Sequence, residues 1–250
     1  MERTAFERRL STSSASRRRF LAMATACAIA PSVSESAQIT GGTGRAALTK
    51  EQRDRLTPGE VLDALKKGNE RFRSGKTAIV DYRDQKRMSA SGQYPAAVIL
   101  GCIDSRAPAE IIFDTGIGDI FTARIAGNVV NDDLLGSMEF ACAVAGAKLI
   151  VLLGHTACGA IKGTIDNVVM GNLTGLLARV KPAIGATAYT GDRSSKNDAF
   201  VDAVATSNVR LGLENIRQRS TILADLEKKK TIDIVGAMYH LSNGVVEFVA

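Results

Sequence analysis

The chain of 250 residues has little cysteine, little histidine and no tryptophan: four Cys, two His and 5% aromatic residues. Four cysteines without a regular spacing are too few for a disulfide framework. No aromatic-rich strand is present that could stack bases, and the chain after residue 37 has no basic block, so we expect no nucleic-acid partner. These absences exclude a small disulfide-stapled protein and direct attention to what the few cysteines do.

The sequence also lacks an apolar run long enough to cross a membrane. Residues 1–37 are basic and Ser-rich, then apolar from Phe20 to Ala30, then rich in small residues. The apolar run is about half of the ~20 residues that a membrane-spanning helix needs, and the order of the three regions is typical of a secretory signal peptide. Within it, "SRRRFL" (16–21) resembles a twin-arginine export signal. We therefore expect an exported, periplasmic protein without a permanent membrane anchor; a disordered basic tail or a lipid-modified Cys27 are the alternatives.

Much of the positive charge belongs to this N-terminal segment. Residues 1–37 hold six arginines and three glutamates, so the formal net charge of +6 falls to +3 without them. The remaining 213 residues show no internal repeat and suit one domain with a sizeable core. We expect residues 38–56 to be a mobile segment and residues 57–250 to form a single zinc-dependent domain, for the reasons given below.

Short apolar runs alternate with helix-like segments over the expected domain. Strands are expected at residues 96–102, 119–125, 148–155 and 232–239, each of the type that is buried on both faces of a parallel sheet. Helices are expected at residues 57–76, 108–114, 132–147 and 158–169, and one or two more over 198–227; the first has a capping signal of Thr57, Pro58 and Glu60. After Asn243-Gly244, the last residues look like a hairpin return. The pattern predicts an α/β fold with a mostly parallel central sheet, flanking helices and an antiparallel edge hairpin at the C-terminus.

Side chains that bind metals follow two of the expected strands. "CIDSR" (102–106) ends one strand and "GHTACG" (154–159) ends another. Because the carboxyl ends of parallel strands share one rim of a sheet, Cys102, Asp104, His155 and Cys158 should meet there. Two thiolates, an imidazole and a carboxylate form a tetrahedral set suited to Zn²⁺. The sequence thus predicts one zinc ion per subunit, whereas Cys142 lies on an apolar helical stripe and is expected in the core.

Asp104 and Arg106 can form a bidentate carboxylate–guanidinium pair. A carboxylate held in this way need not bind zinc, which leaves three protein ligands and an open position for water, as in catalytic zinc sites. If Asp104 is instead a permanent fourth ligand, the site is structural and not catalytic. Redox thiol chemistry is a further alternative, although Cys102 and Cys158 do not form a C-x-x-C pair.

With these motifs in view, the sequence resembles the β-class carbonic anhydrases. The family's C-x-D-S-R and H-x-x-C-G occur at residues 102–106 and 155–159, and flanking matches extend the resemblance over about residues 57–249. The resemblance implies reversible hydration of CO₂ to bicarbonate and a proton by a zinc-bound hydroxide, in a homodimer or higher homo-oligomer with the site near the subunit interface. Hydrolysis of CS₂ or COS on the same zinc site is the alternative hypothesis.

The resemblance also implies roles for single residues. Cys102, His155 and Cys158 would hold zinc, and Asp104 would be a fourth ligand in a closed state or the partner of Arg106 in an open, active one. These roles are inferred from the family's motifs.

Three other positions extend or depart from the family pattern. Gln93, nine residues before Cys102, matches by spacing a glutamine that hydrogen-bonds the substrate. Ile125 replaces the Asn that is usual in "RNAGN", which leaves the hydrogen bonding of that loop open. Because the chain has no Trp, we expect no second bicarbonate pocket of the kind that switches off some relatives at low pH. His240 is expected to be structural, and no proton shuttle is identified.

Overall fold

The computed structural model describes residues 47–249. The predicted signal peptide, with Cys27, lies outside the described residues. The segment predicted to be mobile, residues 38–56, is described from residue 47 onward. There it contains a helix, α1 (Lys50–Arg55), whose N-terminus is stabilised by a capping box between Thr49 and Gln52. Arg53 on this helix is 4% exposed and donates a hydrogen bond to the carbonyl oxygen of Ala145. A buried long-range contact therefore anchors a stretch that has no apolar periodicity of its own.

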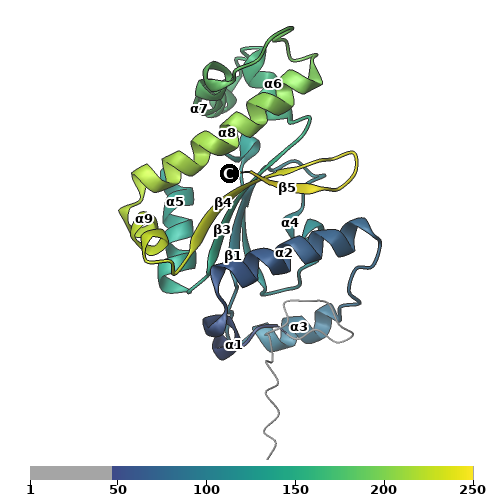
Figure 1. The fold of residues 1–250 in the computed structure, drawn as a ribbon, viewed down its shortest axis with the longest axis vertical. Coiled ribbons are helices and arrows are strands. Elements are labelled where there is room, and N and C mark those ends of the chain that lie inside the picture. The colour runs from purple at the N-terminus through teal and green to yellow at the C-terminus, as the bar shows by residue number, and fades with distance from the viewer. Residues whose placement is uncertain (1–46, 250) are drawn as a thin grey trace, which may run out of the picture. The chain divides into compact units, whose positions relative to one another are not determined.

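Five strands form the central sheet in the order β2-β1-β3-β4-β5 (Figure 1). The strands are β1 (Ala97–Gly101), β2 (Ile120–Arg124), β3 (Leu149–His155), β4 (Asp233–Tyr239) and β5 (Val246–Val249). The first four are parallel and β5 runs antiparallel to β4. The fold class predicted from the sequence is confirmed.

Alternate side chains of the central strands enter two hydrophobic cores, one on each face of the sheet. On β1, Val98 and Leu100 belong to one core, whereas Ala97 and Ile99 belong to the other. Strands β1 and β3 are buried throughout because both of their faces are covered, which explains their unbroken apolar sequences. Strand β2 lies at the sheet edge and is partly exposed, so the prediction that it is buried on both faces is wrong for the single chain.

Helices cover both faces of the sheet (Figure 1). The core on one face is completed by α2 (Pro58–Arg73) and α4 (Ala109–Ile112). The core on the other face is completed by α5 (Asp132–Glu139), α6 (Gly159–Ile165), α7 (Gly171–Ala186), α8 (Asp198–Arg219) and α9 (Thr221–Lys228). Helix α8 contacts both β3 and β4. Among residues 47–249, no helix combines the length and the apolarity that crossing a bilayer requires.

The capping signal of α2 is confirmed: the Thr57 hydroxyl accepts from the N–H of Glu60, whose carboxylate accepts from the N–H of Thr57. Residues 198–227, where one or two helices are predicted, form two, α8 and α9, with Ser220 between them. The segment predicted at 132–147 begins as α5 and continues as a π-helical turn (Phe140–Val144). Cys142 in that turn is 6% exposed and part of the core, as predicted.

Besides α1, two further α-helices of the described chain have no counterpart in the sequence predictions. One is α3 (Tyr82–Ser89), which buries a single residue, Gln85. The other is α7, whose sequence contains Pro182 and three glycines and therefore has a weak helical signal. Its stability comes instead from packing, because Leu177, Val180 and Ala183 are buried.

Candidate metal centre

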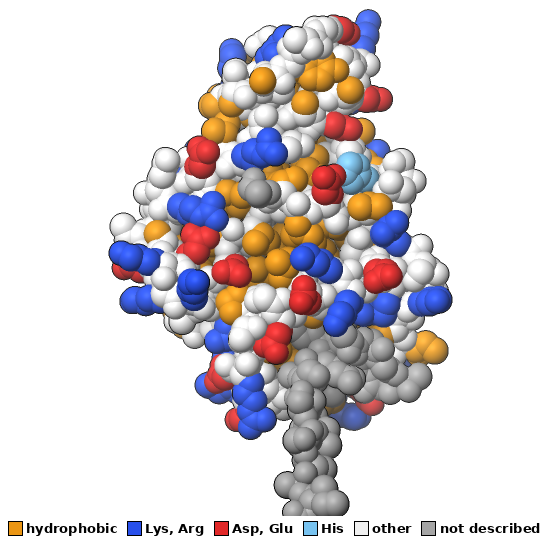
Figure 2. All heavy atoms as spheres, viewed as in Figure 1, with side chains coloured by type: hydrophobic (Ala, Val, Ile, Leu, Met, Phe, Trp, Pro, Cys, Tyr) orange, Lys and Arg blue, Asp and Glu red, His pale blue; other side chains and the backbone are white. Residues whose placement is uncertain are grey.

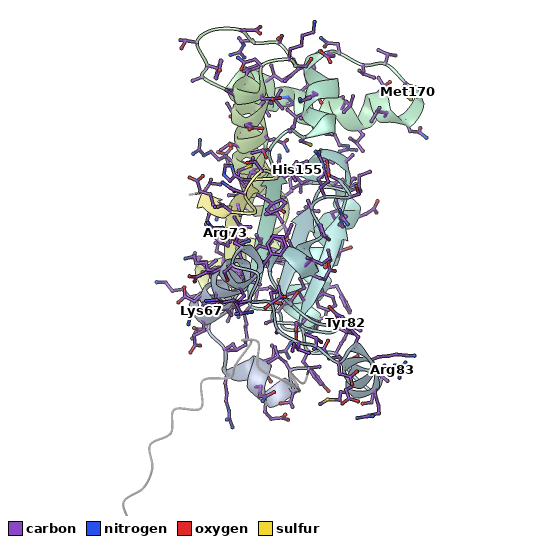
Figure 3. The ribbon with its side chains drawn as sticks, turned by 90° about the vertical axis from the view of Figure 1, so that its right-hand side faces the viewer. Lys67, Arg73, Tyr82, Arg83, His155 and Met170 are labelled. Carbon is purple, nitrogen blue, oxygen red and sulfur yellow. The ribbon has the colours of Figure 1, made fainter. Side chains whose placement is uncertain are left out.

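Cys102, His155 and Cys158 come together at the carboxyl ends of β1 and β3. Cys102 follows β1, His155 is the last residue of β3, and Cys158 directly precedes α6. Their donor atoms all lie within 4.8 Å of one another, and all three side chains are buried. Figure 3 shows His155 at the end of the sheet that lies toward Met170, with Tyr82 at the opposite end. The parallel strands thus deliver the three residues to one rim.

The imidazole of His155 has one nitrogen available for a metal. Its Nδ1 lies 2.9 Å from the carbonyl oxygen of Thr156. A carbonyl oxygen only accepts, so Nδ1 carries the hydrogen and Nε2 has the free lone pair. Nε2 is buried and makes no hydrogen bond to any residue between 47 and 249. A buried acceptor without a partner, close to two cysteine sulfurs, fits a cation that prefers nitrogen and sulfur ligands, such as Zn²⁺.

The two thiols differ in acidity in the metal-free protein. The pKa of Cys102 is lowered because Cys158 donates to its sulfur; His155 and the backbone N–H groups of Asp104 and Gly127 add to this effect and burial opposes it. The pKa of Cys158 is raised, because its proton is held by the Cys102 thiolate and its sulfur is buried. Burial lowers the pKa of His155, but the adjacent Cys102 thiolate, the Thr156 carbonyl and the Asp104 carboxylate together outweigh burial and leave the pKa raised. A bound cation would replace the proton that the two sulfurs share.

Asp104 lies beside the three donors and pairs with Arg106. Arg106 Nε lies 2.9 Å from Oδ1 and Nη2 lies 2.7 Å from Oδ2, and the backbone N–H of Arg106 also donates to Oδ1. The guanidinium holds the pKa of Asp104 well below its usual range. The Oδ2 atom is 3.9 Å from His155 Nε2. Of the two states that the sequence leaves open for Asp104, the structure shows the paired one.

Arg124, which the sequence analysis did not identify, fixes the backbone of the "CIDSR" segment. It is the last residue of β2, and its Nε donates to the carbonyl oxygen of Cys102 at 2.9 Å. Its Nη2 donates to the carbonyl oxygen of Asp104 at 2.5 Å. A basic residue that closes an apolar strand on the same rim as Cys102 is the signal from which this role could be inferred.

The loop after β2 is hydrogen-bonded despite its substitution at Ile125. The Ile125 side chain packs against the core, and its N–H donates to the carbonyl oxygen of Gly101 at 3.0 Å. Asn208 Nδ2 donates to the carbonyl oxygen of Gly127 at 2.9 Å, while the N–H of Gly127 donates to Cys102 Sγ at 3.3 Å. Asn208 on α8 thereby holds the backbone of Gly127, whose N–H stabilises the thiolate of Cys102.

Gln93 is not brought to this centre within one chain. It precedes the N-terminal end of β1, whereas Cys102 follows the carboxyl end of the same strand. In the structure Gln93 lines a small pocket together with Leu48 and Tyr94. A role for Gln93 at a metal centre therefore requires a second subunit.

Comparison with known proteins agrees with this geometry. The family model described as carbonic anhydrase matches residues 97–246. The chain is 38% identical over 196 residues to a carbonic anhydrase of Mycolicibacterium smegmatis, covering 76% of this chain and 92% of that protein. It is 38% identical over 189 residues to carbonic anhydrase 2 of Mycobacterium tuberculosis, covering 75% and 90%.

A solved structure of a tetrameric β-carbonic anhydrase from Sordaria macrospora is similar as well, with a TM-score of 0.57 and 26% identity over 64% of this chain and 83% of that chain. The matched region, residues 97–246, contains Cys102, His155 and Cys158 and the paired carboxylate of Asp104. The chain therefore belongs to the carbonic anhydrase family, and it is a β-class carbonic anhydrase.

Proposed function

We propose that the Cys102–His155–Cys158 cluster binds one Zn²⁺ per subunit and that the protein catalyses the reversible hydration of CO₂ to bicarbonate and a proton. The observation that carries this proposal is the buried cluster with an Arg106-bound carboxylate beside it. When bound, zinc supplies a water whose pKa falls to about 7, so that a hydroxide nucleophile is available near neutral pH. The mycobacterial relatives carry the same family name.

In the proposed reaction Asp104 orients the attacking water. Its lowered pKa keeps it ionised at neutral pH, so its oxygens can only accept hydrogen bonds. Because Oδ2 is 3.9 Å from His155 Nε2, a hydroxyl beside the three donors can donate to it and direct a lone pair toward CO₂. Arg106 engages both oxygens and so opposes the use of this carboxylate as a fourth ligand. That arrangement favours an open catalytic site over a closed structural one.

Stopped-flow measurement of CO₂ hydration, on protein of known zinc content, tests the proposal. We expect the rate to follow zinc occupancy, to vanish after chelation and to return when zinc is added. Cys158→Ser should lose both zinc and rate, whereas Cys142→Ala should retain both because Cys142 lies in the core away from the donors. A fully zinc-loaded protein that is no faster than buffer would refute the function. Parallel assays with COS and CS₂ distinguish the hydrolase alternative.

We also propose that the protein is a homo-oligomer in which another subunit covers the β2 edge. Side chains of β2 are half-buried, and Phe121 contacts Phe140 edge-on, at 6.2 Å between ring centroids, with Phe140 51% exposed. Exposed aromatic surface of this kind is typical of interfaces. The related enzyme from Sordaria macrospora is described as tetrameric. Figure 2 shows a second gathering of hydrophobic side chains, ringed by charged ones, in the middle of the face that carries β4 and β5.

A two-fold axis at the β2 edge that is perpendicular to the strands would reverse the strand direction between subunits. The N-terminal end of β1 in one subunit would then lie toward the carboxyl ends of the strands in the other. Gln93 would act on the substrate of the partner in such a dimer. Light scattering gives the oligomeric state, and Gln93→Ala should lower kcat/KM without loss of zinc. A monomer with full activity would contradict this arrangement.

For the localisation we propose export through the twin-arginine route. The support is the sequence of residues 16–21, which lie outside the described residues. Cell fractionation of the full chain should find the protein in the periplasm. Replacement of both Arg17 and Arg18 by Lys should retain it in the cytoplasm, and unchanged export of that variant would contradict the proposal.

A further inference from the structure

One peptide group lies between the metal-binding imidazole and a carboxylate on another helix. The carbonyl oxygen of Thr156 accepts the hydrogen of His155 Nδ1 at 2.9 Å. The N–H of the same peptide bond, that of Ala157, donates to Asp202 Oδ1 at 2.8 Å. A continuous row of hydrogen bonds thus runs from the Asp202 carboxylate through the Thr156–Ala157 peptide to His155.

Asp202 is held on a rigid element. It lies in the second turn of α8, and its neighbours Val201 and Val204 are completely buried. The helix contacts both β3, which ends in His155, and β4. The position of the carboxylate relative to the imidazole is therefore set by core packing and not by a surface loop.

The turn that carries the peptide needs external support. Ala157 has a φ of +52°, in the left-handed region that is unfavourable for a residue with a Cβ atom. The preceding residue is bound to the sheet, because Thr156 donates its N–H to the carbonyl oxygen of Tyr239 and its hydroxyl accepts the N–H of Leu241, both at 3.0 Å. At Ala157 it is Asp202 that accepts the N–H, which keeps the Thr156 carbonyl directed at the imidazole.

We propose that Asp202 is a positioning residue for the metal-binding imidazole and that it acts through the Thr156–Ala157 peptide. Metal-binding histidines usually donate their second N–H to a carboxylate or a carbonyl, which fixes the tautomer and strengthens the ligand. Here the acceptor is a carbonyl whose own peptide N–H is bound to a carboxylate. Because hydrogen bonds in a row polarise one another, the Asp202 charge makes Thr156 O a stronger acceptor and Nε2 of His155 a better donor to the metal. The inference rests on the metal site of the proposed function.

If Asp202 had a purely mechanical role, a different experimental result would be expected. If Asp202 only holds the left-handed turn, then glycine at position 157, which adopts that conformation freely, should compensate for the loss of Asp202. If the charge acts on His155 through the peptide, glycine cannot replace it. The double variant Asp202→Leu with Ala157→Gly therefore separates the two roles.

Zn²⁺ affinity, measured by competition with a chromogenic chelator, tests the proposal, and the visible spectrum of the Co²⁺-loaded protein reports the ligand geometry. We expect Asp202→Leu to weaken Zn²⁺ binding by about 10- to 100-fold and to alter the Co²⁺ spectrum. Asp202→Asn keeps an acceptor oxygen without the charge and should fall between Asp202→Leu and the unaltered protein. The matched control is Asp198→Leu, one turn earlier on α8, where the carboxylate pairs with Lys162 at the surface; its Zn²⁺ affinity should stay within about twofold.

Two results would overturn the inference. One is Zn²⁺ binding within twofold of the unaltered protein in both Asp202 variants, and the other is full restoration of affinity by Ala157→Gly. Melting temperatures of the metal-free proteins show whether each variant is folded. If Asp202→Leu does not fold, the Zn²⁺ affinity of Asp202→Asn alone decides the test. Failure of the unaltered protein to bind Zn²⁺ would overturn the proposed function and this inference together, whereas normal binding with insensitive variants would overturn this inference alone.

Discussion

Asn69 joins three separate segments, and its replacement should lower the stability of the protein by a measurable amount. The side chain lies on α2 and is 5% exposed. Its Nδ2 donates to the carbonyl oxygens of Ile112 at 3.2 Å and Gly244 at 2.9 Å, and its Oδ1 accepts the N–H of Val246 at 3.0 Å. Asn69→Ala removes all three bonds. At about 1 kcal/mol net for each, the free energy of unfolding should fall by about 3 kcal/mol.

Urea unfolding of the metal-free proteins, followed by circular dichroism at equal protein concentration, measures this difference. A loss of about 3 kcal/mol corresponds to a melting temperature that is roughly 6–12 °C lower for a chain of this size. Glu70→Ala, on the adjacent and exposed side of α2, is the control and should change stability by less than about 0.5 kcal/mol. If Asn69→Ala costs less than about 1 kcal/mol, water or neighbouring groups satisfy the three backbone partners and the reasoning is refuted.

Further results are expected at three positions. Arg106→Ala should reduce CO₂ hydration by roughly tenfold or more at unchanged zinc content, because the neighbouring carboxylate loses its bidentate partner, and Arg106→Lys should restore only part of the rate. An unchanged rate at full zinc occupancy would contradict the role of this pair. Gly212→Ala places a Cβ atom well inside van der Waals contact with Cδ2 of the buried Leu152, so thermal unfolding should show a destabilisation of about 1–3 kcal/mol. Burial raises the pKa of Cys142 to about 12, and the folded protein should therefore lose stability as the pH rises above 9, where the unfolded thiol ionises first. Alkylation at pH 8, read by peptide mass spectrometry, should leave Cys142 unmodified in the native protein, and rapid modification there would disprove its burial.

The sequence by itself determined the sheet and the three donor residues. Strands covered on both faces require unbroken apolar runs, and β1 and β3 have them. Since the carboxyl ends of parallel strands meet on one rim, Cys102 and His155 could be placed together before any coordinates were known. Helices α1, α3 and α7 could not be found in this way. Helix α1 depends on a cap and on the Arg53 contact with Ala145, α3 is polar and buries only Gln85, and α7 shows weak periodicity.

Only the tertiary structure decided which residues support Cys102, His155 and Cys158. The Arg124 contact with Cys102 spans 22 positions and the Asp202 contact with Ala157 spans 45, so neither leaves a local pattern in the sequence. The pairing of Asp104 with Arg106 is local, yet Asp104 would fit a metal-ligand set equally well, and only the side-chain geometry shows that it pairs with Arg106. The physical reason is that periodicity and motifs report which face of an element is buried, whereas the hydrogen-bond partner of a polar side chain depends on the packing of the whole chain around it.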